Sequence, residues 1–183
     1  VRLTRDRDVF IRLRDRIAIA RRAGADLFIS VHADSIGNSR VRGTSVYTLS
    51  ERASDKEAGA LARKENKSDL IAGVDLDDQS NDVVNILIDL AQRETMNESA
   101  VFARKLVDEL AKTRKLLRNT HRFAGFAVLK APDIPSVLVE LGYLSNRSDE
   151  KMLRNPRQRK RMAAAMSTAV KRYFERQQAL NRP

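Results

Sequence analysis

Two residues that could act together in hydrolysis stand at the ends of two apolar runs. His32 follows "DLFISV", and Glu140 closes "SVLVE". An imidazole can bind zinc, and a carboxylate can take a proton from water that the metal activates. The pair is therefore a candidate zinc hydrolase site. A structural histidine and an exposed glutamate at two strand ends remain the alternative interpretation.

The elements that must position this pair alternate between strands and helices. Strands are expected over residues 1–4, 26–32, 43–50, 126–129 and 136–140, and helices over residues 10–23 and 156–178. Gly24 is expected to cap the first helix. The alternation predicts an α/β fold, a three-layer domain with a mostly parallel central sheet flanked by helices. Reactive groups collect at the carboxyl ends of such strands, so His32 and Glu140 should meet at one edge.

The middle of the chain has a different character. Residues 51–82 are charged and favour helix, with a break at Gly73, and Val83 to Leu90 is densely apolar. That apolar segment is expected to be buried or to await a partner. Thr95 and Glu98 form a candidate capping box that would start a new helix. Its core-facing stripe would contain Ala103, Leu106, Val107 and Leu110.

Composition limits the possible functions. The 183 residues suit one domain, and 35 Lys and Arg against 24 Asp and Glu leave a net charge of +11. Such a surface attracts polyanions, which include nucleic acid, anionic lipid and cell-wall polymers. Aromatic residues are only 5% and no nucleic-acid motif is present, so we do not expect nucleic acid as the partner. No membrane span, signal peptide or cysteine is visible.

Two long segments carry a family resemblance. "TRDRDVFIRLRDRIAIARRAGADLFISVHAD" and "AGFAVLKAPDIPSVLVELGYLSN" resemble the zinc-dependent N-acetylmuramoyl-L-alanine amidases. "ENKSDLIAGVDL", with the apolar segment after it, is similar to the insertion of the periplasmic cell-division branch. The resemblance implies a peptidoglycan hydrolase that cleaves the amide between N-acetylmuramic acid and L-alanine during daughter-cell separation. It also implies a location in the periplasm of a Gram-negative bacterium.

The same resemblance assigns roles to residues. His32 in "SVHAD" would bind Zn²⁺, and Glu140 in "LVELGYLSN" would be the catalytic carboxylate. The family takes two further zinc ligands, a histidine and a glutamate, which we expect upstream of Val1. Residues 1–183 would then be an amidase catalytic domain that is incomplete at its N-terminus. His121 does not match the missing ligand and is expected to be exposed.

The resemblance further implies regulation through the insertion at about residues 51–95. In that branch, a glutamate of the insertion occupies the open zinc position until an activator with a LytM-type domain displaces it. Glu65 fits this inhibitory role best, with Glu57 and Glu94 as alternatives, and Val83 to Leu90 would meet the activator. A catalytically inactive cell-wall-binding module and a basic nucleic-acid-binding domain are the competing functional interpretations.

Overall fold

The computed structural model of the chain describes residues 1–71 and 85–180. Within these ranges four strands form one sheet in the order β1-β4-β2-β3. The strands are β1 (Phe28–His32), β2 (Thr44–Leu49), β3 (Leu116–Ala124) and β4 (Ser136–Glu140). The pairings β1 with β4 and β2 with β3 are parallel, whereas β2 and β4 are antiparallel. The predicted α/β fold with a mostly parallel sheet is confirmed.

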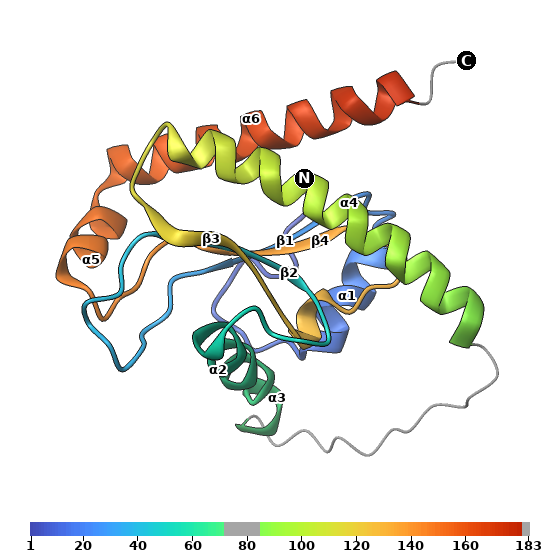
Figure 1. The fold of residues 1–183 in the computed structure, drawn as a ribbon, viewed down its shortest axis with the longest axis horizontal. Helices are drawn as coiled ribbons and strands as arrows, with labels where there is room; N and C mark the ends of the chain where they lie inside the picture. The colour runs from blue at the N-terminus through green and yellow to red at the C-terminus, as the bar shows by residue number, and fades with distance from the viewer. Residues whose placement is uncertain (72–84, 181–183) are drawn as a thin grey trace.

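Helices cover both faces of this sheet and so complete three layers (Figure 1). One face carries two long helices, α4 (Asn85–Ala111) and α6 (Pro156–Leu180). The other face carries α1 (Leu13–Arg22), α2 (Lys56–Asn66), α3 (Ser68–Ile71) and the short 3-10 helix η1 (Ala127–Leu129). Helix α5 (Arg147–Arg154) lies at the end of the sheet and leads into α6. No helix in the described ranges is both long and apolar enough to cross a membrane.

Strand β4 is buried on both faces because each face meets its own apolar cluster. Val137 and Val139 pack with Leu106 of α4, while Leu138 packs with Leu61 of α2 on the opposite face. Burying one aliphatic side chain contributes about 1.5 to 3 kcal/mol. The strand that ends at Glu140 is therefore among the most firmly held parts of the domain.

Helix α1 begins at Leu13, later than predicted, and its first turn is capped from a distance. The backbone N–H of Leu13 donates to both carboxylate oxygens of Asp69, at 3.0 and 3.3 Å. Such a cap satisfies one of the free N–H groups of a helix start. At the other end Gly24 has φ +60°, which confirms its predicted role as the residue that terminates the helix.

Two predictions of local structure were wrong, and one strand was not predicted. Residues 1–4 are not a strand, and residues 126–129 contain η1 instead of a strand. Phe126 and Leu129 are buried, so the apolar run there marks burial without extended structure. The strand β3 was missed because its sequence, "LLRNTHRFA", is largely polar and lies at a sheet edge.

Helix α4 is continuous through Thr95, which contradicts the predicted capping box. The Thr95 hydroxyl donates to the carbonyl of Pro132 at 2.8 Å, and Glu98 accepts from Arg176 at 3.3 Å. The predicted stripe on this helix is confirmed, because Ala103, Leu106 and Leu110 are fully buried and Val107 packs beside them. Of the apolar segment Val83 to Leu90, the first two residues lie outside the described ranges and the others are described in backbone only.

Candidate active site

His32 and Glu140 are direct partners in the parallel pairing of β1 with β4. They share the face of the sheet that α1 and α2 cover, because Phe28 and Leu138, at even spacings along the same strands, belong to the cluster on that face. The two residues therefore come together at one sheet edge, as the sequence predicted. Their proximity follows from register alone.

Glu140 is a fully buried carboxylate with one bound and one open oxygen. Its Oε1 accepts the backbone N–H of Asp34 at 2.8 Å. Its Oε2 is buried without a hydrogen-bond partner among the described residues. Burial raises the pKa of Glu140 to about 8, because a charge there loses its hydration and gains only one N–H donor. The raised pKa brings the titration of Glu140 close to neutral pH, the range that a general acid-base group needs.

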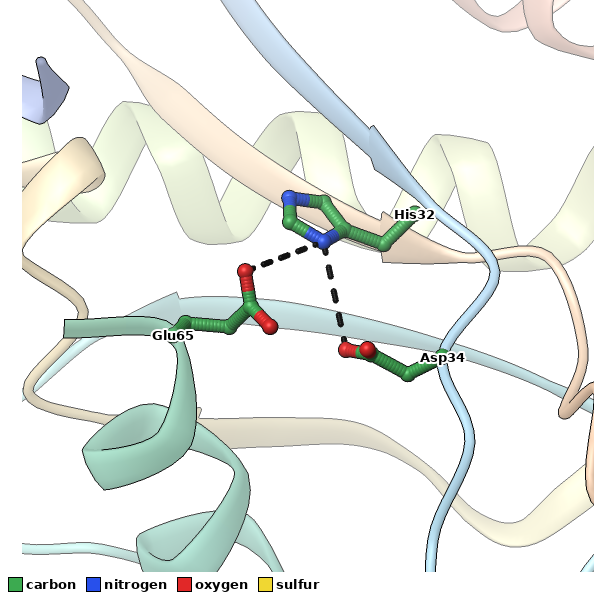
Figure 2. Close-up of side chains that lie close together, drawn as sticks. All are labelled: His32, Asp34 and Glu65. Carbon is green, nitrogen blue, oxygen red and sulfur yellow. Dashed lines mark ion pairs between the residues drawn. The ribbon is translucent and has the colours of Figure 1, made fainter. Parts of the chain in front are cut away.

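His32 is oriented by a neighbour on its own strand. The Ser30 hydroxyl lies 2.9 Å from Nε2, which leaves Nδ1 to face Oε2 of Glu65 at 3.3 Å and Oδ2 of Asp34 at 3.9 Å (Figure 2). Burial lowers the pKa of His32. A neutral imidazole held by a second hydrogen bond is the form that binds metals in proteins.

Glu65 reaches this place from the last turn of α2. Its side chain is only 17% exposed, and burial together with the negative charge of Asp34 raises the pKa of Glu65. Of the alternatives, Glu57 pairs with Arg122 at 3.3 Å, and Glu94 lies on α4, over the opposite face of the sheet. Among the three candidate glutamates, the structure brings only Glu65 to His32.

His121 does not take part in this cluster. It lies on β3, which β2 and β4 separate from β1, and its Nε2 is 3.0 Å from the Thr48 hydroxyl. The side chain is half-buried, so the expectation that it would be exposed was wrong. Its contact with the neighbouring strand β2 explains the burial, and the motif-based exclusion of His121 as a replacement ligand agrees with this position.

Asp34 is the site residue that sequence analysis missed. One atom each of His32, Asp34 and Glu65 lies within 4.8 Å of the others, and Asp34 Oδ2 is buried without a hydrogen-bond partner in the described ranges. One imidazole nitrogen and two carboxylates are a donor set that zinc accepts. These residues therefore fit a zinc ion. The sequence did contain a signal for Asp34. His32 and Asp34 are two positions apart in "HAD", and side chains at this spacing in extended backbone point to the same side.

The backbone after Glu140 is fixed by a buried aspartate. Asp149 accepts the N–H groups of Gly43 at 2.7 Å and Tyr143 at 3.1 Å. Gly142 adopts φ +151°, and a Cβ atom there would lie 3.0 Å from Oδ2 of Asp149. Only glycine fits this approach without strain. The turn therefore keeps the end of β4 in one position.

A cleft of about 1260 Å³ opens beside the site. It is lined by β1, by His32, Asp34 and Glu65, and by the basic side chains of Arg2, Arg5 and Arg16. The arginines favour a ligand that carries negative charge.

Comparisons with known proteins show what the chain is similar to. A family model described as N-acetylmuramoyl-L-alanine amidase matches residues 1–172. The chain is similar to N-acetylmuramoyl-L-alanine amidase AmiA of Escherichia coli, at 40% identity over 94% of this chain and 60% of the relative. It is also similar to AmiC of Neisseria meningitidis, at 37% identity over 94% of this chain and 41% of that protein. The chain thus spans less than two thirds of the length of these relatives.

Solved structures match in fold. The catalytic domain of the amidase CwlV from Paenibacillus polymyxa superposes with a TM-score of 0.63 at 23% identity, over 94% of this chain and 70% of that one. Ami1 of Mycobacterium smegmatis gives a TM-score of 0.63 at 20% identity, over 94% and 65%. At these identities the likeness establishes the α/β fold alone.

Proposed function

This chain belongs to the N-acetylmuramoyl-L-alanine amidase family, and we propose that it hydrolyses the amide between N-acetylmuramic acid and L-alanine in peptidoglycan. The observation that carries the proposal is Glu140, a buried carboxylate whose Oε2 has no hydrogen-bond partner among the described residues, paired in register with His32, the proposed zinc ligand. Residues 1–183 would form most of an amidase catalytic domain in the periplasm. The names of the relatives and the arginines of the cleft support a peptidoglycan substrate, which carries peptide carboxylates.

Each site residue has a distinct task in this reaction. Oε2 of Glu140 accepts a proton from the attacking water and then donates it to the amine of L-alanine as the amide bond breaks. The N–H of Asp34 holds Oε1, so the carboxylate keeps one orientation during both transfers. His32, with further ligands, would hold zinc, which when bound would supply a Lewis acid that polarises the amide carbonyl and acidifies water. Ser30 fixes the imidazole so that Nδ1 faces the site.

The position of Glu65 supports an autoinhibited resting state. Its carboxylate lies 3.3 Å from Nδ1 of His32, so it would occupy the space that water and substrate need at the metal. The insertion at about residues 51–95 would then regulate the enzyme during daughter-cell separation. A LytM-type activator, binding at Val83 to Leu90, would displace Glu65.

The proposal is tested by metal content and hydrolysis together. Elemental analysis measures the zinc content of this chain and of the full-length protein. The full-length protein should hold about one zinc, since a catalytic zinc site holds one ion. Glu140→Gln should lower the release of stem peptides from peptidoglycan at least about a hundredfold without loss of zinc. Glu57→Gln, an exposed glutamate of the same insertion, is the control and should retain activity. A full-length protein without zinc would instead favour a non-catalytic wall-binding module.

A further inference from the structure

The residue before Glu65 makes a separate contact with the site. The ammonium of Lys64 lies 2.6 Å from Oδ1 of Asp34 and donates to the carbonyl of Ser35 at 3.1 Å. Both acceptors lie just beyond β1, whereas Lys64 belongs to the last turn of α2. We propose that Lys64 is a positioning residue, a latch that holds α2 against the end of β1 and thereby keeps Glu65 beside His32. This inference rests on the proposed autoinhibition by Glu65.

Electrostatics explains why such a latch is needed. The carboxylates of Asp34 and Glu65 both approach Nδ1 of His32, with ligand atoms within 4.8 Å of one another (Figure 2). Their side chains are 15% and 17% exposed, so water screens their mutual repulsion only partly. The Lys64 cation is in direct contact with Asp34 and offsets this repulsion. Without Lys64, α2 also loses its contacts with Asp34 and Ser35, so Glu65 should leave the site more often.

The other anchors of the α2–α3 segment hold it to the domain without touching the site. The side-chain amide of Asn66 donates to the carbonyl of Gly125 and accepts the N–H of Ala127, each at 2.8 Å. Asp69 caps α1. Lys64, by contrast, is 49% exposed and reaches the site from the solvent side. Among these contacts, the one made by Lys64 joins α2 directly to the site, while Asn66 and Asp69 keep the segment attached elsewhere.

The test compares four variants of the full-length protein in peptidoglycan hydrolysis without activator. Lys64→Gln removes the cation and should raise basal activity about two- to fivefold, the range expected for a half-exposed ion pair that biases two states. Lys64→Arg keeps the charge and should stay at the wild-type rate. Lys67→Gln changes an exposed lysine at the end of the same helix and should also have no effect. Glu65→Ala reports whether the carboxylate inhibits at all.

Hydrogen exchange supplies a readout that does not depend on activity. In the same full-length variants, amides of α2 should exchange about two- to fivefold faster with Lys64→Gln, and amides of α6 at the wild-type rate. Faster exchange in both helices would indicate general destabilisation and would overturn the latch. The latch would also be overturned if Glu65→Ala raises hydrolysis while Lys64→Gln changes neither hydrolysis nor exchange. If Glu65→Ala is not activated, the autoinhibition proposed above fails, while selective exchange in α2 would still support the contact as a latch.

Discussion

At the scale of single residues, Glu140 owes its properties to what surrounds it. A carboxylate that accepts several N–H groups is stabilised as an anion, but Glu140 accepts only the N–H of Asp34 and is otherwise enclosed by the sheet. Its pKa is therefore raised to about 8, close to the range in which one group can both accept and return a proton. The backbone on either side of the residue must be rigid for this enclosure to persist.

Gly142 provides a test of that rigidity. Gly142→Ala should lower the free energy of unfolding by about 1 to 3 kcal/mol, because the new Cβ would press on Asp149 at a φ that other residues avoid. Gly37→Ala is the matched control, since a Cβ there meets nothing within 4 Å, and should change stability by less than about 0.5 kcal/mol. Urea unfolding measures both, and equal midpoints for the two variants would contradict the strain argument.

The sequence was sufficient for some site residues and insufficient for others. His32 and Glu140 were predicted because each ends an apolar run, and parallel pairing then brings the ends together. Asp34 and Lys64 were not predicted, because their contact joins residues that are 30 positions apart and depends on how α2 docks. No periodicity within α2 encodes that docking.

At the scale of elements, α2 is attached to the sheet through Asp55 and Arg122. The Asp55 carboxylate caps the helix by accepting the N–H of Ala58 at 2.9 Å. The same carboxylate accepts from Nε of Arg122 at 2.9 Å, and this arginine is only 7% exposed. One aspartate therefore both starts the helix that carries Glu65 and binds it to β3.

Removing this aspartate should be costly. Asp55→Ala should lower the free energy of unfolding by about 2 to 4 kcal/mol, because the helix loses its cap and a buried guanidinium loses its principal partner. Asp133→Ala breaks a comparable pair with Arg21, but both of those side chains are about half exposed, so the cost should stay below about 1 kcal/mol. Chemical denaturation compares the two, and a similar loss in both would exclude a special role for Asp55.

The same pair predicts a pH dependence of stability. Burial alone would raise the pKa of Asp55, but hydrogen bonds from Arg122 and Ala58 hold it well below its usual range. A depressed pKa stabilises the folded state above the unfolded-state pKa of about 4, and this contribution is lost as the pH falls. Between about pH 5 and pH 3 the free energy of unfolding should therefore fall more steeply in the wild type than in Asp55→Asn. Parallel curves would contradict the assignment.

Elements were predicted well where apolar residues follow a clear pattern and poorly where they do not. The stripe of α4 and the basic helix α6 followed from helical periodicity. The predicted break at Thr95 failed because Thr95 binds the carbonyl of Pro132, a distant loop, and does not cap a helix. Strand β3 was not predicted, because it lies at the exposed edge of the sheet and its sequence lacks the apolar pattern on which strand prediction depends.

At the scale of the whole molecule, the candidate active site does not explain the net charge of +11. Arg157, Lys160 and Arg161 project from the first two turns of α6 and are exposed. All three tyrosines, Tyr47, Tyr143 and Tyr173, are about 2% exposed or less, and Phe10 and Phe123 are the most exposed aromatic rings of the described residues. The surface should therefore attract polyanions through charge, without reading a base sequence.

This view predicts how the protein should respond to DNA and salt. Binding to duplex DNA should be equal for unrelated sequences, and the logarithm of the affinity should fall linearly with the logarithm of the salt concentration. Changing Arg157, Lys160 and Arg161 together to glutamine should reduce that slope by up to about 3, since each phosphate contact contributes about 0.9. Fluorescence titration at several salt concentrations measures the slope. A sequence-selective complex that resists salt would show that nucleic acid is a specific partner and would revive the alternative that the wall-hydrolase proposal displaces.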